Sequence, residues 1–233
     1  MSAPEPYFAD GQVTLYHGDC RELAEWLAAD VLVTDPPYGR GWKQGAGGTG
    51  GSGRKHRGQY AHDGIAGDES TAVRDEALVM WGNRCGIVFG DPIADRPAGV
   101  RQALGYRKAA DGGNKGTFGG FLRDLELIYL VGPWPAGLNG RSSVLVSGAR
   151  VIGSPYGLAA RYGHPHAKPV DVMETLIAAC PPGVIADPFA GSGSTLVAAR
   201  SLGRRAVGVE IDERFAEAAA RRLSQMDLFG GAA

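Results

Sequence analysis

Short apolar runs alternate along the chain with longer segments in which apolar residues recur every three or four positions. Apolar runs rich in Val, Ile and Leu are typical of buried strands, and the periodic segments are typical of amphipathic helices. The strands are predicted at residues 13–16, 31–34, 86–89, 125–131, 143–146, 183–186 and 206–209. The helices are predicted at residues 21–29, 72–85, 170–179, 194–202 and 213–223.

This alternation indicates an α/β fold, with one Rossmann-like domain that occupies residues 1–233. We expect an open, mostly parallel sheet of about seven strands, covered by helices on both faces. Phe215 and Leu223 lie on the apolar face of the last helix, so Arg221 and Arg222 are expected to face water.

The composition narrows the class of protein. Three cysteines, Cys20, Cys85 and Cys180, have no CxxC spacing, so neither a zinc site nor a disulfide framework is predicted. No apolar stretch approaches the roughly 18 residues of a membrane span, and the chain does not begin with a basic, apolar leader. We therefore expect a cytoplasmic protein that makes no membrane contact. The net charge of −1 leaves any affinity for nucleic acid to local clusters.

One basic cluster lies in a glycine-rich segment. Gly is about twice as common in the chain as its usual share of roughly 7%. Eight of the 37 glycines lie between residues 39 and 53, and such a segment is predicted to be a mobile loop, here residues 40–62. The charged side chains before its end are all positive, namely Arg40, Lys43, Arg54, Lys55 and Arg57.

The first chemical motif, Asp35-Pro36-Pro37-Tyr38-Gly39, directly follows a predicted strand, at the sheet edge where open α/β proteins bind ligands. Its two prolines stiffen the turn and leave the backbone carbonyls as acceptors. An exocyclic amine of a nucleobase carries two N–H donors, which Asp35 and a proline carbonyl are able to accept, and Tyr38 offers a stacking surface. An ordinary strand-to-loop turn is the alternative, because Asp-Pro-Pro also favours turns.

The second motif runs from Ile185 to Thr195, where it follows an apolar run and opens a predicted helix. Its glycines allow a ligand close to the backbone, and its hydroxyls at a helix start suit a carboxylate or phosphate. Glu210 follows the next strand about 20 residues later, where a carboxylate accepts ribose hydroxyls. The two features together predict a nucleoside-bearing cofactor, although a tight turn and a helix-capping acid explain each one separately.

In combination, the two motifs resemble those of the N6-adenine and N4-cytosine DNA methyltransferases. The resemblance is to the permuted β group, in which the Asp-Pro-Pro-Tyr motif precedes the cofactor motif. His17-Gly18-Asp19-Cys20 is similar to the family's GDC element, and His164-Pro165-His166-Ala167-Lys168-Pro169 to its HPxxKP element. The resemblance covers most of the chain, and it implies a circularly permuted motif order, S-adenosyl-L-methionine as cofactor and DNA as substrate.

The resemblance also implies roles for the matching residues. Asp35, Pro36, Pro37 and Tyr38 would hold the target base. The cofactor-binding residues would be Asp19, Cys20, Asp35, Lys168, Asp187, Phe189, Gly191, Ser192, Gly193, Ser194, Thr195 and Glu210.

Within that set the resemblance divides the cofactor among the residues. Asp19 and the Cys20 backbone would contact the adenine edge, and Glu210 the ribose. Lys168, with hydroxyls of the second motif, would hold the methionine carboxylate.

The resulting function is site-specific transfer of a methyl group to the N6 amine of a flipped adenine in double-stranded DNA. In the resembled family, Asp-Pro-Pro-Tyr is more often associated with adenine N6, and cytosine N4 is the alternative. The basic loop is expected to grip phosphates through Arg40, Lys43, Arg54, Lys55 and Arg57, with Trp42 or Tyr60 stacking. A solvated loop without a role is the competing interpretation.

Other parts of the chain leave alternatives open. The mixed stretch 96–115 either adds DNA contacts through Arg101, Arg107 and Lys108 or forms an exposed helix and loop. A short target-recognition region is expected within residues 132–163. His164 and His166 lack further ligands at suitable spacing, so no metal is expected.

The competing functions are an RNA or protein methyltransferase and a DNA-binding module without catalysis. The order of the two motifs speaks against the first, and the presence of both motifs speaks against the second. A homodimer and a restriction endonuclease are the protein partners that the resemblance suggests.

Overall fold

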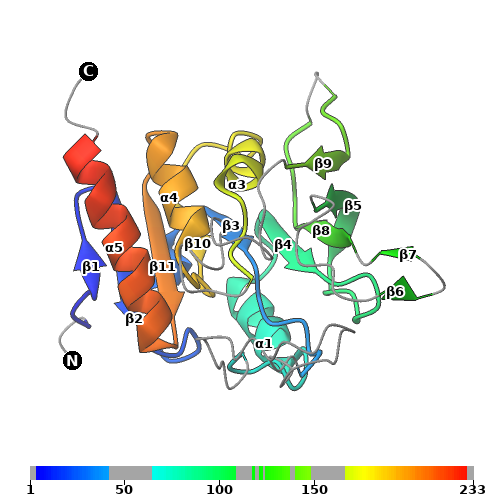
Figure 1. Ribbon diagram of the computed structural model, residues 1–233, viewed down its shortest axis with the longest axis horizontal. Helices are drawn as coiled ribbons and strands as arrows, with labels where there is room; N and C mark the ends of the chain where they lie inside the picture. Colours follow the sequence, from blue (N-terminus) through cyan, green and yellow to red (C-terminus); the bar gives the residue numbers. More distant parts are fainter. Residues whose placement is uncertain are drawn as a thin grey trace, which may run out of the picture.

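The computed structural model describes residues 4–41, 65–108, 117–118, 121–122, 124–136, 140–147 and 166–229. These residues build an α/β fold around a nine-stranded sheet in the order β1-β2-β11-β10-β3-β4-β8-β5-β9 (Figure 1). The strands of this sheet are β1 (Phe8–Ala9), β2 (Val13–His17), β3 (Val31–Thr34), β4 (Gly86–Gly90), β5 (Val100–Arg107), β8 (Leu125–Val131), β9 (Val144–Val146), β10 (Ile185–Asp187) and β11 (Ala206–Glu210). Two short strands, β6 (Thr117–Phe118) and β7 (Phe121–Leu122), pair separately.

Five neighbouring strands, β2, β11, β10, β3 and β4, run parallel to one another. Beyond β4 the sheet continues with β8, which is antiparallel to both β4 and β5. The prediction of a mostly parallel sheet is therefore confirmed. Because parallel strands all end at the same edge, the segments that follow the five strands meet there.

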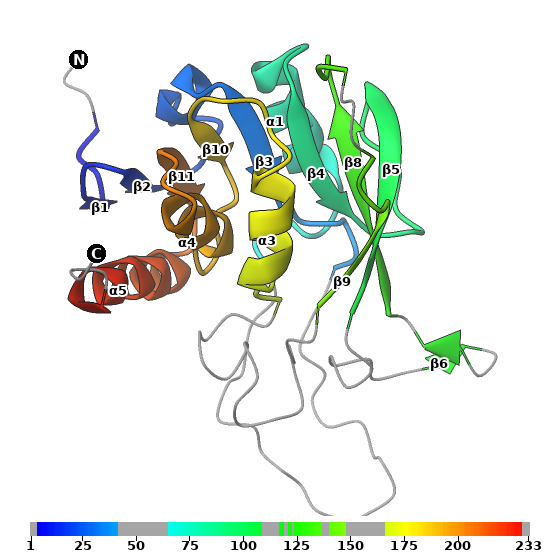
Figure 2. The same cartoon turned by 90° about the horizontal axis from the view of Figure 1, so that it is seen from above.

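Helices cover both faces of the sheet, as predicted, and Figure 2 shows α3, α4 and α5 on one face and α1 on the other. The helices are η1 (Glu25–Ala28, a 3₁₀ turn), α1 (Ala72–Trp81), α3 (Val170–Ile177), α4 (Ser194–Ser201) and α5 (Glu213–Phe229). Alternate residues of a strand face opposite sides. Accordingly, Val31 and Val33 belong to the core cluster under α3, α4 and α5, whereas Leu32 belongs to the cluster that contains Trp26 and Trp81.

The sheet has two strands more than the predicted seven. Strand β1 is only two residues long, and β5 lies in the stretch that was expected to be either a DNA contact or an exposed helix and loop. Arg101, Gln102 and Arg107 are exposed on β5, and Tyr106 is buried. The scarcity of buried positions explains why the strand lacks a clear apolar run.

Two predicted helices are shorter in the structure by four or more residues. The helix expected at 21–29 is reduced to η1, because residues 19–23 form a turn in which the Asp19 carbonyl accepts two backbone N–H groups, those of Glu22 and Leu23. The helix expected at 72–85 stops at Trp81, since Gly82 adopts a φ of 72°, which favours glycine.

The last helix, α5, continues to Phe229, beyond its predicted end at Leu223. Among the described helices, none combines the length and the apolar character needed to cross a membrane.

Candidate functional site

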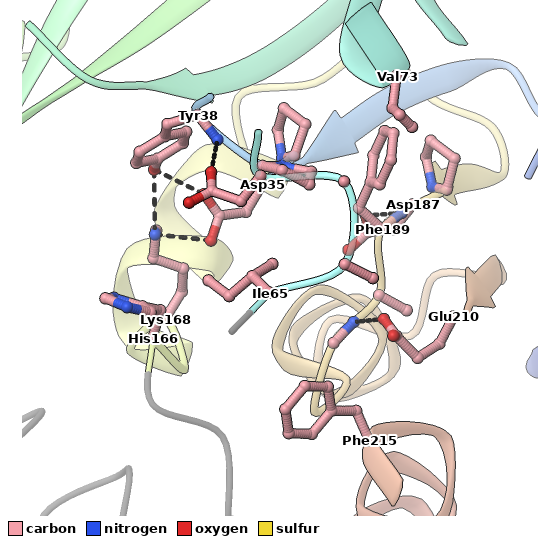
Figure 3. Close-up of a pocket in the computed structure, with 18 of the residues that line it drawn as sticks. Asp35, Tyr38, Ile65, Val73, His166, Lys168, Asp187, Phe189, Glu210 and Phe215 are labelled. Atoms are coloured by element: carbon pink, nitrogen blue, oxygen red, sulfur yellow. Dashed lines mark hydrogen bonds and ion pairs between the residues drawn. The ribbon is translucent and has the colours of Figure 1, made fainter. Parts of the chain in front are cut away.

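The carboxyl ends of the parallel strands open into one cleft with a volume of about 600 Å³. The predicted catalytic and cofactor-binding residues that line it are Asp19, Cys20, Asp35, Pro36, Pro37, Tyr38, Lys168, Asp187, Phe189, Gly191, Ser192, Ser194, Thr195 and Glu210. Figure 3 shows Asp35, Tyr38 and Lys168 on one side and Glu210 and Phe215 on the other, with Ile65 between them in this view. The fold thus joins the two motifs, which are about 150 residues apart in the chain, in a single site.

Three side chains form a closed polar triangle on the Asp35 side. The Tyr38 hydroxyl donates to Asp35 Oδ1 at 2.7 Å, and the Lys168 ammonium lies 2.6 Å from Asp35 Oδ2. Lys168 Nζ also donates to the Tyr38 hydroxyl at 3.2 Å. Burial, followed by the neighbouring Asp35 carboxylate, raises the pKa of Tyr38 well above its ordinary value, so this hydroxyl keeps its proton and acts as a donor.

The Asp68 carboxylate holds the backbone of the turn that carries Asp35 and Tyr38. Its Oδ1 atom accepts hydrogen bonds from the backbone N–H groups of Tyr38 and Gly39 at 2.9 Å and of Arg40 at 3.3 Å. Asp68 is 3% exposed, so these bonds lie away from bulk water. Asp68 was not predictable from the sequence, because it lies about 30 residues after the turn and has no recognisable spacing from it.

A second carboxylate, Glu126, lies behind Lys168. Its Oε2 atom is 3.2 Å from Lys168 Nζ, and its Oε1 atom is 2.6 Å from Lys108 Nζ. Burial alone lowers the pKa of Lys168, but the carboxylates of Asp35 and Glu126 more than compensate and raise it above its ordinary value. Lys168 is therefore an ammonium ion in contact with two acids.

The observed contacts of Lys168 differ from its expected role at the methionine carboxylate. Its ammonium is hydrogen bonded or ion paired to Asp35, Tyr38 and Glu126. In the described part of the chain, no hydrogen bond joins it to Ser192 or Thr195. A role at the cofactor carboxylate stays a prediction for the liganded protein.

Asp187 joins the second motif to the first. Its Oδ1 atom accepts a 2.7 Å hydrogen bond from the Thr34 hydroxyl and a 3.2 Å bond from the backbone N–H of Phe189. Burial raises the pKa of Asp187 to about 6, while hydrogen bonds from the hydroxyls of Thr195 and Thr34 oppose that effect. Asp187 thus shapes the turn that precedes the glycines.

The glycine-rich turn is supported from α5. Gly193 adopts a φ of 79°, and a Cβ atom there would lie 2.9 Å from the Ala219 Cβ atom, so a larger residue would collide with α5. Arg222 reaches under the turn and donates to the Ser192 carbonyl at 2.5 Å and to the Ser192 and Ser194 hydroxyls at 3.3 Å. The expectation that Arg222 faces water is wrong, because its side chain is 8% exposed.

Glu210 faces the same turn from the end of β11. Its two oxygens accept the backbone N–H groups of Gly191 at 2.6 Å and Asp212 at 2.8 Å. Burial raises the pKa of Glu210 to about 7, although these two backbone bonds act in the opposite direction. Each carboxylate oxygen has a second lone pair, so Glu210 can still accept hydrogen bonds from a ligand.

The GDC element lies beside Glu210. The Gly18 N–H donates to the Glu210 carbonyl at 2.9 Å. The Asp19 carboxylate is bound by Arg21, with its closest contact at 2.6 Å, and this interaction lowers the pKa of Asp19. The Cys20 carbonyl accepts a 2.8 Å hydrogen bond from the indole of Trp26, which orders the loop.

The expected DNA contacts are only partly within the described residues. Arg40 lines the cleft, but its guanidinium is paired with Asp91 at 2.9 Å. Lys43, Arg54, Lys55 and Arg57, together with Trp42 and Tyr60, lie outside the described residues, as does most of the expected target-recognition region.

Lys108, from the second basic stretch, lines the cleft and contacts Glu126. His166 is half-buried near Lys168, and desolvation lowers its pKa to about 4. His164 lies outside the described residues. Across the described ranges, no group of three or more His, Cys, Asp or Glu side chains is arranged to hold a metal ion.

Comparison with known sequences places the chain among methyl-transferring proteins. A family model described as DNA methylase matches residues 149–221. The chain is 46% identical over 239 residues to the putative methylase YubD of Escherichia coli K12, a match that covers 89% of this chain and 88% of YubD. It is 49% identical over 65 residues to the type II methyltransferase M.ScaI of Streptomyces caespitosus, but that match covers only 27% of this chain and 21% of M.ScaI.

Comparison with solved structures supports the fold. PvuII DNA methyltransferase, described as cytosine-N4-specific, superposes with a TM-score of 0.60 at 16% identity, covering 93% of this chain and 88% of that chain. The M1.HpyAVI–SAM complex gives a TM-score of 0.57 at 18% identity, with 91% and 98% covered. A putative DNA modification methylase from Thermus thermophilus, TTHA0409, complexed with S-adenosyl-L-methionine, gives 0.53 at 20% identity, with 92% and 95% covered.

Proposed function

Because the chain belongs to the S-adenosylmethionine-dependent N6/N4 DNA methyltransferase family, we propose that it methylates the exocyclic N6 amine of an adenine flipped out of DNA. The observation that carries the proposal is the position of the Asp35 turn directly across one cleft from Glu210 and the glycine-rich turn. An amine acceptor and a nucleoside-binding carboxylate thus face the same space.

Asp35 is the acceptor for the target amine. Its two oxygens contact Tyr38 and Lys168, but each has a further lone pair for an amine hydrogen. Pro36 and Pro37 also line the cleft, and neither has a backbone N–H that would compete for the acceptors. Two acceptors that draw both amine hydrogens out of the ring plane localise the nitrogen lone pair, which makes the amine a better nucleophile.

Tyr38 contributes in two ways. Its hydroxyl orients the Asp35 carboxylate through a 2.7 Å hydrogen bond, and its ring offers a surface for the base. An amine within a duplex does not reach this cleft, so the nucleotide must leave the base stack at a cost of a few kcal/mol. Stacking on Tyr38 recovers part of that cost.

The other side of the cleft fits the cofactor. Glu210 is suited to accept ribose hydroxyls, Asp19 lies where it can meet the adenine edge, and the hydroxyls of Ser192 and Thr195 are suited to the carboxylate. S-adenosyl-L-methionine, when bound, supplies an electrophilic methyl group on a sulfonium. Asp35 orients the amine, and no covalent intermediate with the protein is required.

The preference for adenine N6 over cytosine N4 rests on the aspartate at position 35, through the family tendency that links Asp-Pro-Pro-Tyr with adenine. The fold does not distinguish the two bases, because the chain shares it with a cytosine-N4-specific enzyme. Methylation at cytosine N4 would therefore correct the proposed target base.

The test is methylation of duplex DNA with labelled S-adenosyl-L-methionine, followed by separation of the digested nucleosides. We expect labelled N6-methyl-2′-deoxyadenosine with the wild type and at least about a hundredfold less with Asp35→Asn, which keeps the shape but removes the charge. Asp95→Asn alters an exposed acid as the control and should leave the rate unchanged. Label in N4-methyl-2′-deoxycytidine would correct the target base, and label only in RNA or protein would overturn the proposed function.

A further inference from the structure

Four charged side chains of alternating sign form a chain from the side of the cleft to Asp35. The Lys108 ammonium lies 2.6 Å from the Glu126 carboxylate, which lies 3.2 Å from the Lys168 ammonium. The Lys168 ammonium in turn lies 2.6 Å from the Asp35 carboxylate. The side chains of Lys168 and Glu126 are each 7% exposed, and that of Lys108 is 22% exposed. The inner two charges are therefore withdrawn from water.

Glu126 does not belong to either sequence motif. It lies on β8, in the antiparallel part of the sheet, where its register partner on β5 is Tyr106. A buried carboxylate loses several kcal/mol of hydration, and replacement of buried ion pairs by apolar residues is often neutral or stabilising. Stability alone is thus a weak reason for an acid here, whereas its position behind Lys168 gives it influence over Asp35.

We propose that Glu126 is a positioning residue for methyl transfer, which holds the Lys168 ammonium between two carboxylates and so leaves Asp35 a strong acceptor for the target amine. This inference rests on the proposed function. Without Glu126, Lys168 would have only one carboxylate partner and would pair with Asp35 alone. Asp35 would then bind the amine hydrogen less strongly.

The electrostatic consequence has a definite sign. Burial has the largest effect on Asp35 and raises its pKa, whereas Lys168 lowers this pKa and Glu126 raises it further. Tyr38 and Asp187 also face Asp35. Removal of the Glu126 charge should therefore lower the pKa of Asp35.

The surroundings of Glu126 predict the opposite effect for a second variant. Glu126 itself is faced by Lys168, Lys108, Tyr106 and His166. Removal of the positive Lys108 charge would leave the negative charge of Glu126 less neutralised. Glu126 would then repel the Asp35 carboxylate more strongly, so the pKa of Asp35 should rise.

The experiment measures kcat against pH at saturating S-adenosyl-L-methionine and duplex DNA. We expect Glu126→Gln to lower kcat by about tenfold and to shift the acid limb of the kcat–pH profile to lower pH by about one unit. The KM for the cofactor should change less than about twofold. Glu126→Asp keeps the charge and should restore the acid limb. Glu217→Gln, an exposed acid on α5, is the control and should leave both parameters unchanged.

Lys108→Gln provides an independent sign test, which also applies if Glu126→Gln fails to fold. The acid limb of its kcat–pH profile should move to higher pH. A limb that is unchanged or that moves to lower pH would overturn the inference. The same holds if Glu126→Gln folds and keeps the wild-type profile, or loses activity without a shift of the limb. A wild type that methylates no DNA would overturn the proposed function and this inference together, which separates the two failures.

Discussion

The Thr34 hydroxyl donates a 2.7 Å hydrogen bond to the Asp187 carboxylate and so connects the ends of β3 and β10. Thr34 is 1% exposed and Asp187 is 2% exposed. Thr34 immediately precedes Asp35, and Asp187 opens the turn that leads to Gly191. The bond therefore connects the Asp35 side of the cleft to the side of the glycine-rich turn.

Thr34→Val should weaken this connection, because it removes the donor and keeps the shape of the side chain. The loss of one partner from a buried hydrogen bond costs about 1–3 kcal/mol. We expect a lower free energy of unfolding by urea and a reduced kcat/KM. Thr34→Ser retains the hydroxyl and should stay close to the wild type in kcat/KM. Equal losses in the two variants would show that the hydroxyl, and with it the hydrogen bond, does not account for the effect.

Asp68→Ala should loosen the turn that carries Asp35 and Tyr38, since three backbone N–H groups lose their acceptor. A small displacement of a reacting group is able to cost about a hundredfold in rate. We expect kcat to fall by about tenfold to a hundredfold while the dissociation constant of the cofactor, measured by calorimetry, stays within about twofold. Glu69→Ala changes the exposed neighbour and should affect neither quantity.

Arg222→Met should destabilise the glycine-rich turn, whereas Arg221→Met should not. The Arg222 guanidinium donates to three oxygens beneath the turn, whereas the Arg221 side chain is 71% exposed. Loss of the buried donor should lower the free energy of unfolding by about 1–3 kcal/mol and weaken cofactor binding. Thermal unfolding and calorimetric titration of the two variants side by side test this difference. Similar behaviour of both would contradict it.

Glu210 should make stability depend on pH. Burial raises its pKa from 4.5 to about 7, so the folded protein holds this proton more tightly than the unfolded chain. The resulting stabilisation is fully present below pH 4.5 and is lost as the pH rises through about 7.

Glu210→Gln should therefore flatten the decline in the free energy of unfolding over this range, measured in urea without cofactor. Asp187, whose pKa is about 6, leaves a residual slope in the variant. An identical slope in both proteins would contradict the assignment.

The parallel half of the fold follows closely from local pattern. Strands β3 and β4 are continuous apolar runs because both faces are covered by helices, and such runs are recognisable without knowledge of their neighbours. Strand β5 was not recognisable, since only one of its eight residues is buried and its pairing with β8 depends on residues distant in the chain. The turn at residues 19–23 was also missed, because the local contacts of Asp19 override a helical pattern.

The residues of the site also fall into two groups, one predictable from local sequence and one not. Asp35, Tyr38, Lys168 and Glu210 were predictable because each belongs to a short motif with characteristic spacing. Asp68, Glu126 and Arg222 are isolated in sequence and reach the site only through tertiary packing. A signal for Glu126 existed, since an acid in phase with the buried Ile128 of a strand is unusual.

The antiparallel strand β8 carries Glu126, and Lys108 directly follows β5, so this part of the sheet sets the electrostatic environment of a reaction whose motifs lie on the parallel strands. This has a practical consequence for protein engineering. A chimaera that took β5, β8 and their flanking residues from another methylase would also exchange the charges that face Lys168. Grafting of the two motifs alone onto a related sheet would transfer the reacting groups without their counterions.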